Sequence, residues 1–276
     1  WSERKYSYDY LLKNIEKIKK IINSNGVSPG SVVSIVGDFS PKSIALFLAL
    51  IEHSCIIVPL TNNSIVKQNK LFDLSEAEFI FRLDSLDNIK FEKTSKVSKI
   101  EYYERIRLKN HPGLVLFTSG TSGVPKGAVH DLLLLLEKFK IKRKALRTLN
   151  FLLFDHWGGL NTMFHILSNI GILITTYDRT PEKICHQIEL YKIQLLPASP
   201  TFLNLLLLSE SYKNHDMSSL EIISYGTEPM PINTLKKLKK IFPNVKLLQT
   251  YGLIELGVMK SKSENNESLW VKVGGE

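Results

Sequence analysis

The chain has 276 residues, of which 43% are hydrophobic and 23% are charged, and its formal net charge is +9. This composition is typical of a folded globular protein with a substantial core, and it excludes a disordered or fibrous chain. Much of the excess positive charge lies in short runs such as those at 140–144 and 236–240, and no aromatic residues interleave with them. The runs therefore favour solvated helix faces over a nucleic-acid-binding surface, and we expect no nucleic-acid partner.

Helical periodicity alternates with short β-branched runs along the chain. A first helix is predicted within residues 6–26, and its apolar stripe comprises Leu11, Leu12, Ile15, Ile18, Ile21 and Ile22. A strand at 31–37, a helix at 41–53 and a strand at 55–60 then make a βαβ unit. Further strands are predicted at 78–83, 113–118, 151–154, 171–176, 193–198, 221–226 and 245–252, and further helices at 181–191, 200–210 and 231–241.

This alternation predicts an α/β fold with two packed, doubly wound, mainly parallel sheets and flanking helices. The first unit is expected to cover residues 26–150, and the second to combine residues 1–25 with 151–276. The five leucines at 132–136 are predicted to form a core helix, in preference to a lipid-binding patch.

The most membrane-like segment, residues 44–60, is interrupted by Glu52 and His53. Neither half reaches the roughly 20 apolar residues that a membrane span needs, so we predict a buried helix followed by a strand. Cys55 and Cys185 are far apart and show no CxxC or Cys/His ligand spacing. They are expected to be reduced core residues of a cytoplasmic protein. The chain opens on Trp1 without a secretory signal, as expected for a trimmed piece of a longer protein.

The segment TSGTSGVPKG, residues 118–127, follows a predicted strand. Gly120, Gly123 and Gly127 let the backbone turn tightly and approach a ligand, while hydroxyl groups and Lys126 add donors and positive charge. Because ligands of open parallel sheets collect beyond the carboxyl ends of strands, this segment predicts a phosphate site. It matches neither the Walker loop nor the GxGxxG fingerprint.

These ten residues closely resemble the phosphate-binding loop of the adenylate-forming superfamily. That superfamily contains acyl- and aryl-CoA synthetases, luciferases and the adenylation domains of nonribosomal peptide synthetases. The resemblance implies the fold of the family's N-terminal domain and a loop that holds the β- and γ-phosphates of ATP. The residues with this implied role are Thr118, Ser119, Gly120, Thr121, Ser122, Gly123 and Lys126.

A second segment, QTYGLIE at 249–255, resembles the family's tyrosine-glycine-x-threonine-glutamate motif. The resemblance implies that Tyr251 stacks on adenine, that the flanking Thr250 and Gly252 also bind the nucleotide, and that Glu255 binds Mg²⁺. A flat ring offers a stacking face, and a carboxylate is a hard ligand for a hard cation.

One residue departs from the family's pattern, because Ile254 stands where a threonine usually contacts the α-phosphate. Such a charge-assisted hydrogen bond is typically worth about 1.5–3 kcal/mol, which corresponds to roughly ten- to hundredfold in rate. The departure predicts a slow enzyme or a homologue that has lost catalysis.

Two further segments resemble family pockets. SYGTEPMP at 224–231 resembles the part that wraps adenine, which implies a nucleotide pocket with Gly226, Thr227 and Glu228. FDHWGGLNTMFHIL at 154–167 resembles the acid-binding segment of CoA ligases. The implied acid-pocket residues are His156, Trp157, Gly158 and Gly159, joined by Ser199 and Thr201. The residues alone leave open that His156 and Trp157 simply pack where a strand meets a helix.

The family's reaction is attack of a carboxylate on the α-phosphorus of ATP, which gives an acyl-adenylate and pyrophosphate. The acyl group then passes to the thiol of CoA or of phosphopantetheine on an acyl carrier protein. Lys126 and Glu255 are the implied catalytic residues, since with Mg²⁺ they offset the repulsion between two anions. Our leading interpretation is a portion of a carboxylic acid ligase. The alternatives are amino-acid activation, in which Asp155 could hold an α-amino group, and a catalytically impaired nucleotide-binding homologue.

The resemblance runs from about residue 6 to residue 257 and covers only part of a typical family member. The ribose-binding aspartate and the mobile C-terminal domain with its catalytic lysine fall outside it, and that domain would act in cis or in trans. We therefore expect this chain alone to bind nucleotide weakly and to adenylate inefficiently.

Overall fold

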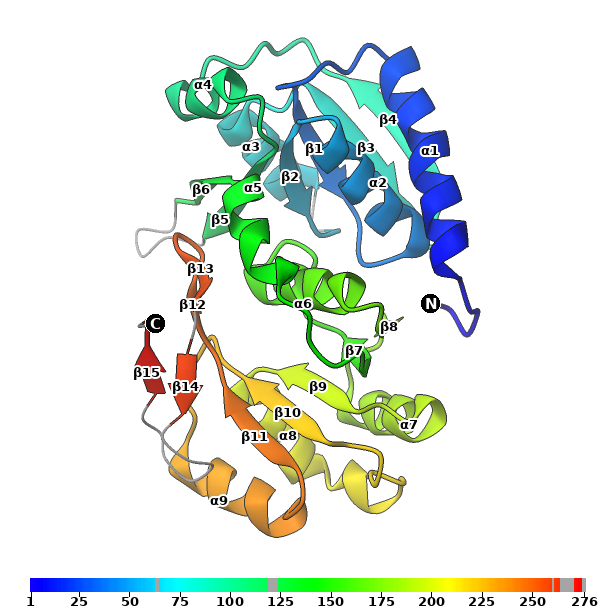
Figure 1. Ribbon diagram of the computed structural model, residues 1–276, viewed down its shortest axis with the longest axis vertical. Helices are drawn as coiled ribbons and strands as arrows, with labels where there is room; N and C mark the ends of the chain where they lie inside the picture. The colour runs from blue at the N-terminus through cyan, green and yellow to red at the C-terminus, as the bar shows by residue number, and fades with distance from the viewer. Residues whose placement is uncertain (63–64, 119–123, 260, 264–270, 275–276) are drawn as a thin grey trace. The chain divides into compact units, whose positions relative to one another are not determined.

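The structure is a computed structural model that describes residues 1–62, 65–118, 124–259, 261–263 and 271–274. The chain divides into two compact units (Figure 1). Unit 1 comprises Trp1–Lys138 and Leu153–His156, and unit 2 comprises Phe139–Leu152 and Trp157–Glu276. Among the described residues, none of the helices combines the length and the apolar character that crossing a bilayer requires.

Unit 1 is built on a six-stranded sheet with the order β4-β3-β1-β2-β5-β6. Its strands are β1 (Val32–Val36), β2 (Ile56–Leu60), β3 (Phe79–Leu83), β4 (Ile89–Lys93), β5 (Gly113–Thr118) and β6 (Lys126–Asp131). The inner strands are parallel, whereas β4 and β6 pair antiparallel at the two edges. Strands β1 and β2 are buried at every position, as expected for strands that are covered on both faces.

The helices of unit 1 are α1 (Tyr8–Ser24), α2 (Pro41–Glu52), α3 (Ile65–Ser75), α4 (Glu101–Leu108) and α5 (Leu132–Leu136). Helix α2 begins with a capping box between Ser40 and Ser43, and Pro41 occupies its first turn. Helix α1 buries Ile15, Ile18 and Ile22 and packs against α2. Residues 1–25 therefore belong to unit 1, which differs from the predicted division, because the apolar stripe of α1 is covered by a helix of that unit.

Unit 2 is built on a five-stranded parallel sheet with the order β11-β10-β9-β7-β8. Its strands are β7 (Arg147–Asn150), β8 (Ile172–Thr175), β9 (Leu195–Ala198), β10 (Ile222–Tyr225) and β11 (Lys246–Gln249). Its helices are α6 (Trp157–Ser168), α7 (Pro181–Tyr191), α8 (Pro200–Ser209) and α9 (Ile232–Ile241). The core includes the fully buried Ile184, Leu203 and Ile223.

Short elements complete the chain. The 3-10 turns are η1 (Glu137–Lys140), which contains the boundary between the units, and η2 (Ser211–Lys213). Two small antiparallel pairs follow β11 in sequence: β12 (Tyr251–Leu253) with β13 (Gly257–Met259), and β14 (Ser261–Ser263) with β15 (Val271–Val273). The predicted α/β fold with mainly parallel sheets and flanking helices is thus confirmed.

Two predicted strands differ from the structure. The strand predicted at 151–154 lies at 147–150 instead. The apolar residues at 151–154 that suggested it belong to two different units. Phe154 packs in unit 1 with its ring centroid 5.1 Å from that of Phe39, while Phe151 packs in unit 2 at 4.7 Å from Phe202. The strand expected at 245–252 ends at Gln249, and β12 begins at Tyr251.

The leucine run does form helix α5, but the prediction of a core helix is wrong for much of it. Leu132 is buried, whereas Leu133 and Leu134 are exposed. The prediction for the cysteines is confirmed, since Cys55 and Cys185 are both buried free thiols. Burial raises the pKa of each thiol to about 12, because desolvation disfavours the thiolate.

Candidate nucleotide and acid site

The glycine-rich segment joins two paired strands of unit 1. Strands β5 and β6 run antiparallel, and Thr118 lies opposite Lys126 in their register. Both ends of the segment therefore reach the same edge of the sheet, beyond the carboxyl end of β5, and Lys126 is exposed there. The predicted phosphate-loop residues between them lie outside the described residues: Ser119, Gly120, Thr121, Ser122 and Gly123.

In unit 2, the predicted site residues follow four strands of one parallel sheet. Trp157, Gly158 and Gly159 open α6 after β7, and Ser199 and Thr201 open α8 after β9. The adenine segment, residues 224–231, begins in the last two residues of β10. The Tyr251 motif, residues 249–255, begins at the last residue of β11. Because carboxyl ends of parallel strands meet at one edge, the structure brings these segments together along a single edge of the sheet (Figure 1).

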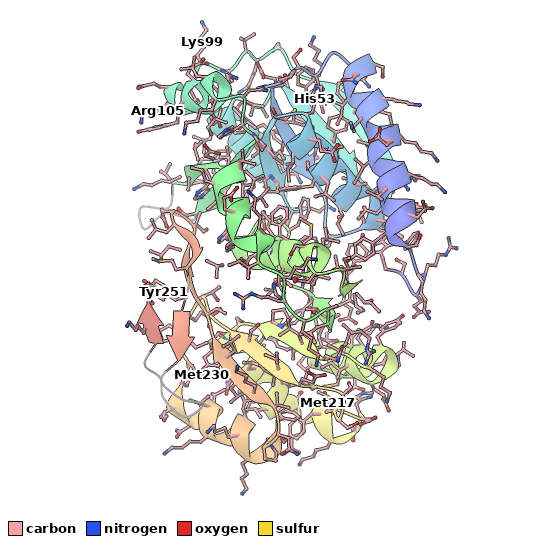
Figure 2. All side chains as sticks on the ribbon, viewed as in Figure 1. His53, Lys99, Arg105, Met217, Met230 and Tyr251 are labelled. Carbon is pink, nitrogen blue, oxygen red and sulfur yellow. The ribbon has the colours of Figure 1, made fainter. Side chains whose placement is uncertain are left out.

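The adenine segment and the Tyr251 motif are in direct contact. The backbone N–H of Thr250 donates to the carbonyl oxygen of Tyr225 at 2.7 Å, and its hydroxyl donates to the same oxygen at 3.1 Å. A Cβ atom on Gly226 would lie 2.5 Å from Thr250 Oγ1 and 2.6 Å from the Thr250 carbonyl oxygen. Only glycine therefore fits at this approach of the two segments. Tyr251, which is labelled in Figure 2, follows directly. Its relative exposure is 40%.

A further contact joins the adenine segment to the predicted acid pocket. The Thr201 hydroxyl donates a hydrogen bond to the Glu228 carboxylate. Thr227 lies between Gly226 and Glu228 with a φ of +73°, a left-handed conformation that β-branched residues adopt rarely. Ser199 accepts a hydrogen bond from the backbone N–H of Phe202 at 3.1 Å. Its hydroxyl is thus the N-cap of α8, which gives Ser199 a structural task.

The hairpin of β12 and β13 rests on the start of α6. Gly257 begins β13 with a φ of +73°, and a Cβ atom there would lie 2.7 Å from Nε1 of Trp157. Trp157 is only 4% exposed, so its indole ring supports the hairpin that carries Tyr251. Glu255 is exposed on the turn between the two strands. Gly252 lies on β12 opposite Val258.

Gly257 was not among the predicted site residues. Its sequence signal is weak, because a glycine two residues after a turn glutamate has many possible reasons. Its close approach to Trp157 becomes visible only when α6 and the hairpin are seen together.

Gly257→Ala is expected to lower the free energy of unfolding by about 2–4 kcal/mol, because the left-handed conformation and the indole contact both oppose a methyl group. The matched control is Gly274→Ala, whose φ is +74° but whose Cβ would meet nothing within 4 Å. The control should lose only the roughly 1–2 kcal/mol of the backbone conformation. Denaturant unfolding of both variants measures the difference, and equal losses would mean that Trp157 does not constrain the hairpin.

The segment before α6 belongs to unit 1 and is held by Asp155. Its Oδ2 accepts hydrogen bonds from the Thr61 hydroxyl at 2.9 Å and from the Thr61 backbone N–H at 3.3 Å, just after β2. His156 is largely exposed and lies 4.0 Å from the Asp155 carboxylate. The alternative that these two residues simply pack where a strand meets a helix therefore fits the buried Trp157 but not the exposed His156. Sequence reasoning also missed Thr61, whose contact with Asp155 spans 94 positions.

Asn150, at the end of β7, fixes the first turn of α6. Its side-chain N–H donates to the carbonyl oxygen of Gly159 at 3.1 Å, and both residues are buried. A Cβ atom on Gly158 would meet only Leu152, at 3.3 Å. The two glycines therefore let α6 begin close to the chain that enters it.

Comparison with known proteins gives a consistent family. The profile described as AMP-binding enzyme matches residues 1–274. Acyl-CoA synthetase 7 of Caenorhabditis elegans is 30% identical over 185 residues, which cover 61% of this chain and 34% of that protein. The D-alanine–D-alanyl carrier protein ligase of Streptococcus pneumoniae is 22% identical over 284 residues, which cover 94% of this chain and 54% of that protein.

Solved structures share the fold. The N-terminal subdomain of Klebsiella oxytoca NpsA, in complex with 3-hydroxyanthranilyl-AMSN, has a TM-score of 0.76 at 14% identity and covers 98% of this chain and 69% of that chain. The luciferase-like enzyme of the mealworm Zophobas morio has a TM-score of 0.74 at 19% identity, with 93% and 68% covered.

The chain spans about a third to a half of the length of the two relatives. The profile match nevertheless extends over nearly the whole chain and confirms the resemblance drawn from the motifs. This chain belongs to the AMP-binding enzyme family.

Proposed function

We propose that this chain binds ATP with Mg²⁺ and forms the nucleotide and acid site of a ligase that converts a carboxylic acid to an acyl-adenylate. The acyl group would then pass to the thiol of CoA or of carrier-bound phosphopantetheine. The observation that carries the proposal is the contact between Gly226 and Thr250, which joins two separately recognised motifs at one sheet edge. The chain spans about half of the carrier protein ligase and about a third of the acyl-CoA synthetase. We therefore expect adenylation by this chain alone to be weak.

Each motif has a role in this proposal. The partly exposed ring of Tyr251 would stack on adenine, and the backbone after Gly226 would border the base. Thr118 and Lys126 would contact the phosphates. Glu255 offers an exposed carboxylate on a turn, which fits Mg²⁺ as a hard oxygen ligand. When bound, Mg²⁺ would neutralise part of the phosphate charge.

The residues of the chain have complementary tasks in the proposed reaction. Lys126 would reduce the repulsion between the approaching carboxylate and the phosphates, because a full positive charge near developing anionic oxygens stabilises them. The contacts that fix Tyr251 and Trp157 would hold nucleotide and acid in a constant orientation. Positioning and charge neutralisation are therefore the main contributions expected from this chain.

A second candidate, activation of an amino acid, rests on Asp155. One carboxylate oxygen is held by Thr61, while the buried Oδ1 has no hydrogen bond among the residues that the structure describes. A substrate ammonium group could pair with it. The similarity to a D-alanine–D-alanyl carrier protein ligase over 94% of this chain supports the same candidate.

Titration of the chain with a fluorescent ATP analogue and Mg²⁺ tests the nucleotide proposal. Tyr251→Ala is expected to weaken binding about tenfold, because it removes the stacking face. Tyr251→Phe is the matched control and should bind like the parent chain. Equal binding by all three proteins would refute the placement of adenine on Tyr251.

The two acid classes are separated by ATP–pyrophosphate exchange in the presence of fatty acids, aryl acids or amino acids. Amino-acid-dependent exchange that is lost in Asp155→Asn would favour the second candidate. Exchange with fatty or aryl acids that survives this substitution would favour the first. Binding of ATP by the intact gene product without exchange for any acid would support the impaired homologue that Ile254 suggests.

A further inference from the structure

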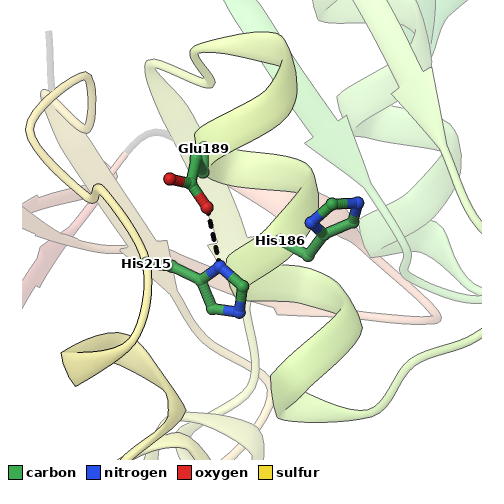
Figure 3. Close-up of side chains that lie close together, drawn as sticks. All are labelled: His186, Glu189 and His215. Carbon is green, nitrogen blue, oxygen red and sulfur yellow. Dashed lines mark hydrogen bonds and ion pairs between the residues drawn. The ribbon is translucent and has the colours of Figure 1, made fainter.

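A cluster of histidine and carboxylate side chains lies on α7, away from the motifs above. Glu182, His186 and Glu189 are four and three residues apart, so they lie along one face of the helix. His215, from the segment after η2, lies beside this face (Figure 3). One ligand atom from each of His186, Glu189 and His215 lies within 4.8 Å of the others.

The two ring nitrogens of His215 have different partners. Nδ1 lies 2.7 Å from Oε2 of Glu189, and Nε2 lies 2.8 Å from Oε1 of Glu182. A histidine that binds a metal commonly donates its other ring N–H to a carboxylate, which fixes the ring. Glu182 lies where it can accept the N–H of Nε2. Nδ1, the nitrogen beside Glu189, is then the atom that would bind the metal.

The cluster is separate from the nucleotide motifs. His215 also lines a hollow of about 490 Å³, together with residues such as Met217 and Phe242. The lining segments precede β10 and β11, so they lie at the amino edge of the unit 2 sheet. The nucleotide motifs follow the carboxyl ends of the same strands. His186 is exposed, so water can reach the cluster and supply a further ligand.

We propose that His186, Glu189 and His215 bind one divalent transition-metal ion of the zinc class, with Glu182 as a positioning residue. Two imidazoles and a carboxylate suit Zn²⁺, whereas Mg²⁺ and Ca²⁺ prefer oxygen ligands alone. With metal–ligand bonds of about 2.0–2.1 Å, ligand atoms of a tetrahedral site lie about 3.4 Å apart. The cluster must therefore contract by about 1.4 Å at its widest. His186 is exposed and can rotate to do so.

The alternative is an ion-pair cluster without metal. In that case protonated His215 pairs with two carboxylates, and the ion pairs raise the pKa of His215 and lower the pKa values of Glu182 and Glu189. His186 separates the two descriptions, because it is a metal ligand in one and only a ring neighbour of His215, with ring centroids 5.9 Å apart, in the other.

The test uses the 276-residue chain without a histidine tag, stripped with a chelator and titrated with Zn²⁺ in the absence of nucleotide. We expect one Zn²⁺ per chain, and Co²⁺ in its place should give the visible absorption of a tetrahedral site. His186→Ala should weaken binding more than a hundredfold. Glu182→Ala should weaken it about ten- to hundredfold, because it removes the acceptor that orients a ligand.

The matched control is His111→Ala. His111 Nδ1 also contacts a carboxylate, that of Asp131 at 2.9 Å, but it belongs to no group of three ligands among the described residues. Zinc affinity should be unchanged in this variant. Absence of stoichiometric binding, or equal affinity in His186→Ala and the parent chain, would overturn the proposal and leave the ion-pair cluster. Because no nucleotide is present, the result is independent of the proposed ligase function.

Discussion

Gly226→Ala is expected to weaken ATP binding about 5- to 150-fold while the chain remains folded. The new methyl carbon would lie 2.5 Å from Thr250 Oγ1 and 2.6 Å from the Thr250 carbonyl oxygen, distances at which the atoms must move apart. Overpacking of this kind typically costs about 1–3 kcal/mol, and about 1.4 kcal/mol is tenfold in affinity.

The added methyl group should displace the segments of the site and leave the strands of the sheet in place. Strands β10 and β11 are held in register up to the pair Tyr225 and Gln249, so the strands themselves resist movement. The segments beyond them give way, and with them the hydrogen bond from Thr250 to Tyr225. These segments carry Thr227 and Tyr251, which the proposed function places against the nucleotide.

A double-mutant cycle with Thr250→Ala checks this explanation. Thr250→Ala alone removes the side-chain hydrogen bond to Tyr225 and should have a small effect, since such a bond is worth about 1 kcal/mol. It also removes one of the two atoms that oppose the methyl group, so the double variant should bind ATP better than the sum of the single effects predicts. Titration with an ATP analogue measures all four proteins, and circular dichroism shows whether they are folded. Strict additivity, or unchanged affinity in a folded Gly226→Ala chain, would contradict the steric argument.

The sequence predicted the inner strands of unit 1 well, because a strand that is buried on both faces has a local signal. A strand buried on both faces must be apolar along its length, and the runs at β1, β2 and β5 show this directly. The edge strands of unit 1, β4 and β6, were missed for the converse reason. β4 has the sequence IKFEK with no buried position, and β6 contains Lys126, His130 and Asp131. Such strands are specified by pairing with a neighbour, which the local pattern does not reveal.

Strand β7 shows a different limit. Its buried positions include Thr148 and Asn150, so the strand has no apolar run, while the apolar residues that follow belong to two separate units. A pattern of hydrophobicity identifies burial but does not say which core buries a residue. The strand was therefore assigned four residues too late.

The sequence revealed the motifs of the candidate site, but it did not reveal the contacts between them. The order of the motifs along the chain indicated nucleotide chemistry, but the approach of Gly226 to Thr250 depends on β10 and β11 being neighbours in the sheet. The histidine cluster depends even more on contacts between residues that are distant in sequence. The spacing of His186 and Glu189 on a helix can be read from the sequence, whereas His215 lies 26 positions from Glu189 and is brought there only by the packing of η2 on α7.

Ile254→Thr is expected to raise the rate of acyl-adenylate formation about ten- to hundredfold. Position 254 lies on the turn beside Glu255, in the hairpin that Gly257 and Trp157 hold in place. In the proposed site, a hydroxyl there would donate to an α-phosphate oxygen as charge develops. A hydrogen bond to a charged group is worth about 1.5–3 kcal/mol, and about 1.36 kcal/mol is tenfold in rate.

Ile254→Val is the matched control, because valine has nearly the shape of threonine and lacks the hydroxyl. Acid-dependent ATP–pyrophosphate exchange should rise in the threonine variant and stay at the parental rate in the valine variant. Since the hydrogen bond is proposed to strengthen in the transition state, ATP affinity should change less than the rate. A stable acyl-adenylate analogue should bind more tightly to the threonine variant only. Equal behaviour of the two variants in both assays would mean that position 254 does not face the reacting phosphorus.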